Sequence, residues 1–207
     1  MRRWTWVVAA SVLVAGCGGG SATPHVSVAP SEARSLAEAL LDRSLAAAVT
    51  QPWRPVHDAK SGVSFELPGA SNVRSDKSER VYSVALTQLA EVSASIVQTT
   101  STAKARSSVQ KWAANNIALI QRNGVKDAKV IATHTSTSPD GLVVDAQLAY
   151  TPLARKTGPP VVWLAHLTQQ GTRVITLQTV VIPFDRAPLY LKAARALQKR
   201  LVDSLKD

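Results

Sequence analysis

One segment near the C-terminal end of the chain is apolar on both faces when it is extended. Between positions 174 and 182, Ile175, Leu177 and Val181 fall on one side, and Val174, Val180 and Ile182 fall on the other. A strand with one buried face would instead alternate apolar and polar residues. The segment therefore predicts a strand at the centre of a sheet, with layers of structure covering both of its faces.

Six further segments have strand-like patterns. The segment from Ser61 to Pro68 places Val63, Phe65 and Leu67 on one side. The seven predicted strands cover residues 61–68, 81–89, 92–99, 125–133, 142–150, 160–168 and 172–182. Ser138-Pro139-Asp140-Gly141 and Gln169-Gln170-Gly171 separate the last two pairs, and such Gly-containing sequences predict tight turns because Gly accepts positive φ.

Three segments instead carry apolar residues at the 3.6-residue period of an amphipathic helix. The first covers 31–50, begins at Ser31 or Ser35 and ends before Pro52, and its expected apolar face is Leu36, Leu40, Leu41, Leu45 and Ala48. The second covers about 104–122, with Trp112 as a core anchor and Asn123-Gly124 as the cap. The third follows Asp185, and its stripe is Tyr190, Ala194, Leu197, Leu201 and Leu205.

The order is therefore helix, three strands, helix, four strands, helix. Runs of antiparallel hairpins between helices predict an α+β fold, in which an antiparallel sheet of about seven strands is flanked by helices.

The N-terminal segment is organised as an export signal. Residues 1–3 are short and basic, and residues 4–14 form an apolar run too short to span a bilayer. The following Val14-Ala15-Gly16-Cys17, which contains the only cysteine, resembles the lipobox of bacterial lipoproteins. The resemblance implies cleavage between Gly16 and Cys17, and attachment of a diacylglyceryl group and further acyl chains, such as palmitate, at Cys17.

Two alternatives stay open for this segment. Cys17 could be an ordinary small apolar residue of an N-terminal helix, and Arg2-Arg3 could belong to a twin-arginine signal. With the lipobox interpretation, the chain divides into a signal peptide at 1–16, a flexible tether at 17–30, the amphipathic helix at 31–50 and an α+β sandwich domain at 55–207. We then expect the mature protein on the extracytoplasmic side of the cell membrane, held there by lipidated Cys17.

Catalytic motifs are absent from the sequence. It contains no nucleophile elbow, zinc-protease motif, phosphate-binding loop or paired carboxylates. One Cys and four His exclude a disulfide framework and a Cys-rich zinc site. We therefore expect no enzyme activity, metal or cofactor, but an extracytoplasmic hydrolase with a spatially assembled site is the alternative, with His57 beside Asp58, or His166, as its candidate residues.

Positive charge is the remaining indication of a partner. The chain has 24 Lys and Arg against 14 Asp and Glu, and loss of Arg2 and Arg3 with a signal peptide would leave 22 against 14, or +8. Lys192, Arg195, Lys199 and Lys206 fall on one side of the last predicted helix. These residues form either a solvated helix face or a surface for anionic lipid headgroups or acidic envelope polymers. We expect no nucleic-acid binding, because the basic residues are not interleaved with aromatic ones.

The order of these segments supports a resemblance to a known fold. The short strand at Gly62–Pro68, the helix about forty residues later, the four strands around the two Gly-containing turns and the closing helix look like the PsbP-like α/β/α sandwich. Within that fold, the strand at 172–178 feeding a terminal helix is similar to the LpqN family of actinobacterial lipoproteins. The resemblance implies a non-catalytic extracytoplasmic domain that binds a protein or envelope component, and it carries over no catalytic residues.

Overall fold

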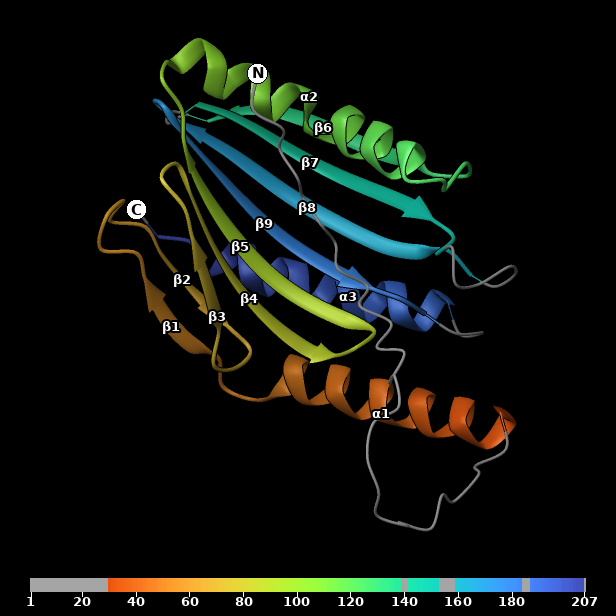
Figure 1. Ribbon diagram of the computed structural model, residues 1–207. Coiled ribbons are helices and arrows are strands. Elements are labelled where there is room, and N and C mark those ends of the chain that lie inside the picture. The colour runs from red at the N-terminus through yellow and green to blue at the C-terminus, as the bar shows by residue number, and fades with distance from the viewer. Residues whose placement is uncertain (1–29, 139–140, 153–158, 184–186, 207) are drawn as a thin grey trace, which may run out of the picture.

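A curved antiparallel sheet of seven strands organises the fold (Figure 1). The computed structural model describes residues 30–138, 141–152, 159–183 and 187–206. The strands follow the order β3-β4-β5-β9-β8-β7-β6 across the sheet. Their bounds are β3 Asn72–Ser75, β4 Glu79–Thr87, β5 Ala90–Gln98, β6 Lys129–Ser138, β7 Gly141–Tyr150, β8 Val161–Gln170 and β9 Arg173–Val181. The predicted fold class, an antiparallel seven-stranded sheet with flanking helices, is confirmed.

Strand β9 occupies the central position, between β5 and β8. Its residues are buried from Val174 through Thr179, and Val181 is buried as well. Helices cover both faces of the sheet at this strand, so neither set of alternating side chains reaches solvent. The prediction from the doubly apolar segment is therefore confirmed.

One strand of the observed sheet differs from the predicted set. The predicted strand at 61–68 becomes β2 (Ser64–Leu67), which pairs with β1 (Arg54–His57) in a separate two-stranded ribbon. Its place among the seven is taken by β3, whose four residues are all exposed. Because β3 has no apolar alternation, its pattern did not predict a strand, and it forms by pairing with β4.

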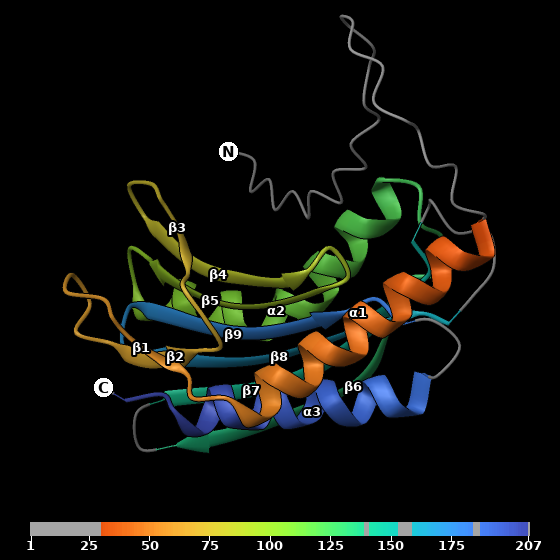
Figure 2. The same cartoon turned by 90° about the horizontal axis from the view of Figure 1, so that it is seen from below.

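The helices lie in two layers (Figures 1 and 2). Helices α1 (Pro30–Thr50) and α3 (Ala187–Asp203) pack on one face of the sheet and against each other, and α2 (Thr102–Arg122) packs on the other face over β7, β8 and β9. The first face encloses the larger core, which includes Phe65, Ile175 and Tyr190. The two layers of helices and the sheet between them form an α/β/α sandwich.

Helix α1 is an integral part of this sandwich. Leu41, Leu45 and Ala48 are buried in the same core as the residues of α3, and the helix ends before Pro52 as predicted. Leu40 was expected on the same face but is 56% exposed, because it lies beside the narrow stripe that contacts β4 and α3.

Helix α2 has defined ends and a buried stripe. The Ser101 side chain accepts a hydrogen bond from the backbone N–H of Lys104, which satisfies one free donor at the N-terminus. Gly124, with φ of +98°, follows the C-terminal cap as the predicted Asn-Gly pair requires. On the sheet side, Trp112 packs edge-on against Trp163 with ring centroids 5.3 Å apart, so it serves as the core anchor expected of it.

Strand β6 begins four residues later than the predicted strand at 125–133. Val125 and Ala128 are buried in the turn that follows α2, and the Val125 N–H donates to the carbonyl of Ile120 at 3.3 Å. The apolar side chains of the turn therefore belong to the end of the helix, and the strand forms from exposed residues at the edge of the sheet.

Several predicted features lie outside the described residues. They are the signal peptide at 1–16 with Gly16, the lipid attachment site Cys17, the tether before position 30, Pro139-Asp140 of one turn and the helix cap at Asp185. Of the helices that the structure describes, none combines the length and the hydrophobicity that a bilayer-spanning segment needs.

Candidate functional site

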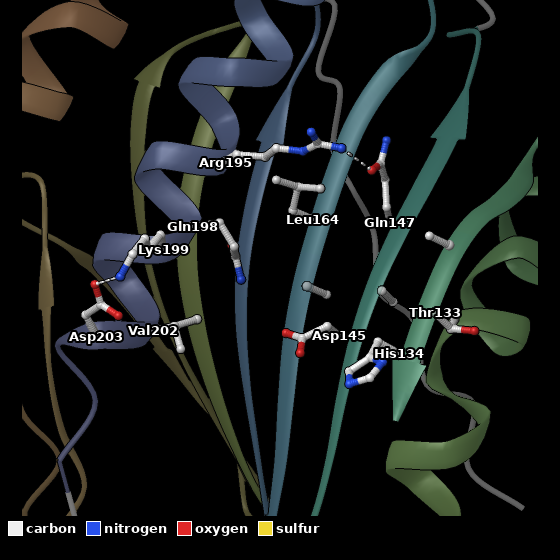
Figure 3. Close-up of a pocket in the computed structure, with 13 residues that line it drawn as sticks. Thr133, His134, Asp145, Gln147, Leu164, Arg195, Gln198, Lys199, Val202 and Asp203 are labelled. Atoms are coloured by element: carbon white, nitrogen blue, oxygen red, sulfur yellow. Dashed lines mark hydrogen bonds and ion pairs between the residues drawn. The ribbon is translucent and has the colours of Figure 1, made fainter. Parts of the chain in front are cut away.

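A groove lies between α3 and the β6 side of the sheet (Figure 3). The buried stripe of α3 packs over β8 and β9, and this leaves β6 and β7 beside the helix. The resulting groove has a volume of about 410 Å³, which is within the range of small-molecule sites. One wall comes from α3, and the other comes from β6, β7 and β8.

The helix wall carries two of the predicted basic residues. Arg195 and Lys199 are one turn apart, and both are exposed along the groove. The Lys199 Nζ lies 2.6 Å from Oδ2 of Asp203, four residues further along α3. The side chains of this pair are 75% and 56% exposed, so the ion pair contributes little to stability and can be exchanged for another partner.

Arg195 differs from Lys199 in its contacts. Its Nη2 donates to Oε1 of Gln147 on β7 at 3.5 Å, a long hydrogen bond to a neutral group (Figure 3). Within the described part of the chain, Arg195 forms no ion pair. The guanidinium therefore spans the groove without a compensating carboxylate.

A row of ionisable side chains crosses the three strands that form this wall, and its first two members line the groove. His134 on β6, Asp145 on β7 and His166 on β8 are direct cross-strand neighbours, so all three lie on the same face. Nδ1 of His166 lies 2.7 Å from Oδ1 of Asp145. Because the ionised carboxylate can only accept, Nδ1 donates in this hydrogen bond. Both carboxylates of the groove, Asp145 and Asp203, therefore have partners already.

His166 also extends this row into a chain of three groups. Its Nε2 lies 3.2 Å from Oγ1 of Thr168, so carboxylate, imidazole and hydroxyl follow one another in the order used by nucleophilic hydrolases. Thr168 is only 7% exposed, and neither it nor His166 lines the groove. The chain therefore has the order of a catalytic triad without an evident path for a substrate to its hydroxyl.

The other predicted basic residues lie away from the groove. Lys192 is exposed on α3 but is not part of the groove wall. Lys206 is not on the helix, because α3 ends at Asp203. The backbone N–H and carbonyl of Lys206 instead pair with those of Ser64 at 2.8 Å each, which ties the end of the chain to β2. The structure thus brings two of the four predicted residues into one site.

Arg200 has a role that its position in the sequence did not indicate. It follows Lys199 directly, yet it points toward α1, where its Nη1 donates to the carbonyls of Val49 at 3.0 Å and Gln51 at 2.9 Å. Its guanidinium lies 4.7 Å from the centroid of the Trp53 ring. This cation therefore holds the C-terminal end of α1 and is not part of the groove.

His57 and Asp58 do not form a catalytic pair. Nδ1 of His57 lies 2.9 Å from Oγ of Ser64, whereas the Asp58 carboxylate is buried and paired with Arg80. Burial opposes ionisation of Asp58, but the hydrogen bond and charge of Arg80 and the N–H groups of the following turn hold its pKa below the ordinary value. Asp58 is therefore committed to a structural ion pair.

Three residues of the strand wall, His134, Asp145 and Gln147, were not predicted as site residues. Asp145 and Gln147 alternate along β7 on its more exposed side, and this alternation is the one sequence signal that could have placed them together. Their distance from Arg195 along the chain is what concealed the groove. Over the ranges that the structure describes, no group of three or more His, Cys, Asp or Glu is arranged to hold a metal ion.

Comparisons with known proteins identify the fold but neither a family nor a function. No protein-family model matches the sequence, and no curated protein matches it significantly. The solution structure of cyanobacterial PsbP (CyanoP) from Synechocystis is similar with a TM-score of 0.55 and 12% identity, covering 74% of this chain and 91% of that one. A mutant of the protein Mog1 is similar with a TM-score of 0.46 and 13% identity, covering 75% and 96%. The first similarity shows that this domain has a PsbP-like fold.

Proposed function

We propose that this PsbP-like chain is a lipid-anchored extracytoplasmic protein of the LpqN family, and that it binds an anionic component of the cell envelope in the groove beside α3. The observation that carries the proposal is Arg195. Its exposed guanidinium spans the groove with only a neutral amide as partner, while the groove carboxylates are occupied by His166 and Lys199. An anionic ligand would provide the charged hydrogen-bond partner that Arg195 lacks in the groove.

Charge elsewhere on the protein supports the same ligand class. The chain without Arg2 and Arg3 has a net charge of +8, which attracts polyanions over a distance and raises their association rate. The lipobox at Val14-Ala15-Gly16-Cys17 supports the anchor, and the lack of catalytic motifs supports binding over turnover. In this proposal the groove supplies specificity, and the anchor keeps it a short tether away from the membrane.

Soluble poly(glycerol phosphate) provides a test of the groove that does not depend on membrane insertion. We expect the full chain to bind this polymer, and Arg195→Gln to weaken binding about tenfold, as expected for loss of one charge-assisted contact. Lys192→Gln is the matched control, because it removes the same charge from the same helix outside the groove. Equal losses in both variants would show that net charge alone attracts the polymer and would refute the groove.

The anchor needs a separate measurement. We expect the protein to partition into the detergent phase when expressed in a bacterium that processes lipoproteins, and Cys17→Ala to move it to the aqueous phase. A Cys17→Ala protein that partitions like the wild type would refute lipid attachment at this residue, without bearing on the groove.

Hydrolysis is a second candidate function, favoured by the chain from Asp145 through His166 to Thr168. If Thr168 is a nucleophile, Thr168→Val and His166→Gln should each abolish turnover in an esterase and peptidase screen. A wild-type protein that turns over nothing in the screen would remove this candidate. Activity that survives Thr168→Val would exclude this residue as the nucleophile.

A further inference from the structure

A second cavity lies on the opposite face of the sheet from the groove beside α3. On this face α2 packs over β7, β8 and β9, and Figure 1 shows β3, β4 and β5 without a helix in front of them among the described elements. The cavity has a volume of about 370 Å³. Strands β3, β4, β5 and β9 line it, α2 forms one wall, and the turn between β4 and β5 closes one end.

Three uncharged polar side chains lie on the floor of this cavity, among apolar residues such as Val81 and Val180. Ser83, Ser93 and Gln178 come from β4, β5 and β9, and Ser93 and Gln178 are each 7% exposed. Oε1 of Gln178 accepts a hydrogen bond from Nε1 of Trp163 at 2.8 Å. That bond fixes the side chain, and its amide nitrogen forms no hydrogen bond within the described residues. The floor therefore holds an oriented donor beside two hydroxyl groups.

The wall on α2 adds an aromatic surface and a second amide. Trp112 lines the cavity and is itself held edge-on against Trp163. Nδ2 of Asn116 donates to the Trp112 carbonyl at 2.9 Å, so one hydrogen bond fixes this amide also. Two rigid amides and an indole ring thus border the same space.

The charged groups around the cavity balance each other. Arg74 from β3 and Glu91 from β5 are the charged lining residues, one of each sign. Although much of Glu91 is exposed, desolvation of its carboxyl by the surrounding protein raises its pKa. An anion in the cavity would meet Glu91, and a cation would meet Arg74. The two charges cancel, so the lining has no net charge that would favour an ionic ligand over a neutral one.

Polarity then distinguishes between neutral ligands. An acyl chain would cover the hydroxyl of Ser83 and the amide nitrogen of Gln178 without offering them partners, which is unfavourable. A sugar offers hydroxyls that both donate and accept, and its C–H faces pack against indole rings. We propose that this cavity binds a neutral saccharide, such as a unit of an envelope glycan, independently of the groove beside α3.

Isothermal titration calorimetry can test this proposal on the full chain in a detergent without a sugar headgroup. The probes are maltotriose, cellotriose, chitotriose and mannotriose. We expect at least one to bind with a Kd in the micromolar to millimolar range. Ser83→Phe should abolish binding by filling the cavity, and Glu91→Ala should weaken it about tenfold by removing a hydrogen-bonding group to the sugar. Lys111→Ala, at an exposed position of α2 outside the cavity lining, is the control and should leave trisaccharide binding unchanged.

Three outcomes would overturn the proposal. The first is that no trisaccharide binds up to about 10 mM, a weak limit for a specific site. The second is that Ser83→Phe and Glu91→Ala both bind like the wild type. The third is that oleate binds in place of the sugars and is lost in Ser83→Phe, which would identify an apolar occupant. If Ser83→Phe does not fold, Glu91→Ala decides, because its side chain is largely exposed.

Discussion

Replacement of Arg200 by methionine tests how α1 is held in the fold. Arg200 on α3 contacts the last turn of α1 and the residues after it, about 150 positions earlier in the chain. Methionine keeps much of the length and apolar area of the side chain, so the substitution removes mainly the charge and the hydrogen bonds. The expected loss can therefore be worked out from the contacts of the guanidinium.

Three contributions add up. The two hydrogen bonds to Val49 and Gln51 contribute about 1 kcal/mol together at this partly exposed position. The cation over the Trp53 ring contributes about 0.5–1 kcal/mol, and a positive charge at a helix C-terminus about 0.3–1 kcal/mol. Arg200→Met should therefore lower the free energy of unfolding by about 2 kcal/mol, and the Tm by about 4–8 °C for a domain of this size.

Urea unfolding at pH 7 and hydrogen exchange provide the measurements. The amides of residues 39–50 should exchange faster in Arg200→Met, because the end of α1 loses its attachment, whereas those of α2 should follow only the global change. Lys199→Met is the control at the neighbouring position, and it should cost less than about 0.5 kcal/mol because its ion pair is exposed. Equal losses in the two variants, or unchanged exchange in α1, would refute the role assigned to Arg200.

Three further predictions concern stability. Asp58 has a folded-state pKa below its unfolded value, so the stabilisation it provides above the unfolded pKa is lost as the pH falls through the folded pKa. The free energy of unfolding, measured as a function of pH, should show this loss below about pH 4 in the wild type but not in Asp58→Asn. The substitution leaves Arg80 unpaired, so it should also cost about 3 kcal/mol at pH 7. Parallel pH curves for the two proteins would contradict this prediction. Burial and the nearby charge of Asp76 raise the pKa of Glu79, so its ionisation destabilises the fold at neutral pH, and this effect disappears below the unfolded pKa. Glu79→Gln should therefore raise the free energy of unfolding by about 1 kcal/mol at pH 7 but not at pH 3, and thermal melts at both values check it. Gly141, at φ of +144°, would place an added Cβ 2.2 Å from a backbone oxygen of the neighbouring strand, whereas Gly62, at φ of +79°, has open space there. Gly141→Ala should thus cost more than about 2 kcal/mol and Gly62→Ala about 1–2 kcal/mol, and equal costs in urea unfolding would show that the close approach is relieved.

The sequence predicts those elements whose pattern of apolar residues shows which of their faces are buried. The stripe of α2 and the doubly apolar β9 each have a period that only one environment satisfies, so their type and their place in the layers follow from the pattern. Strands β1 and β3 are mostly or fully exposed, so their sequences have no apolar pattern that predicts a strand. They form because a neighbouring strand offers backbone partners, which is a property of the assembled sheet and not of the segment.

The exposed basic residues of α3 were predicted, but the groove beside this helix was not, for a related reason. The helical period places Arg195 and Lys199 on the side opposite the leucine stripe, and the structure confirms their exposure. Their partners across the groove depend on which strands lie beside α3, and that follows from the strand order of the whole sheet. Arg200 shows the same limit, since its partners on α1 are set by helix packing.

The position of β9 also sets the order in which the sheet can be completed. The last strand to be synthesised is the middle strand in space, so β3–β5 and β6–β8 remain separate half-sheets until residues 173–181 are available. Until then β5 and β8 each present an open edge to other chains. A chain that stops before β9 would therefore contain two separate half-sheets with open edges and would be prone to aggregate. A chain that lacks the edge strand β3 would still keep its six remaining strands in one continuous sheet.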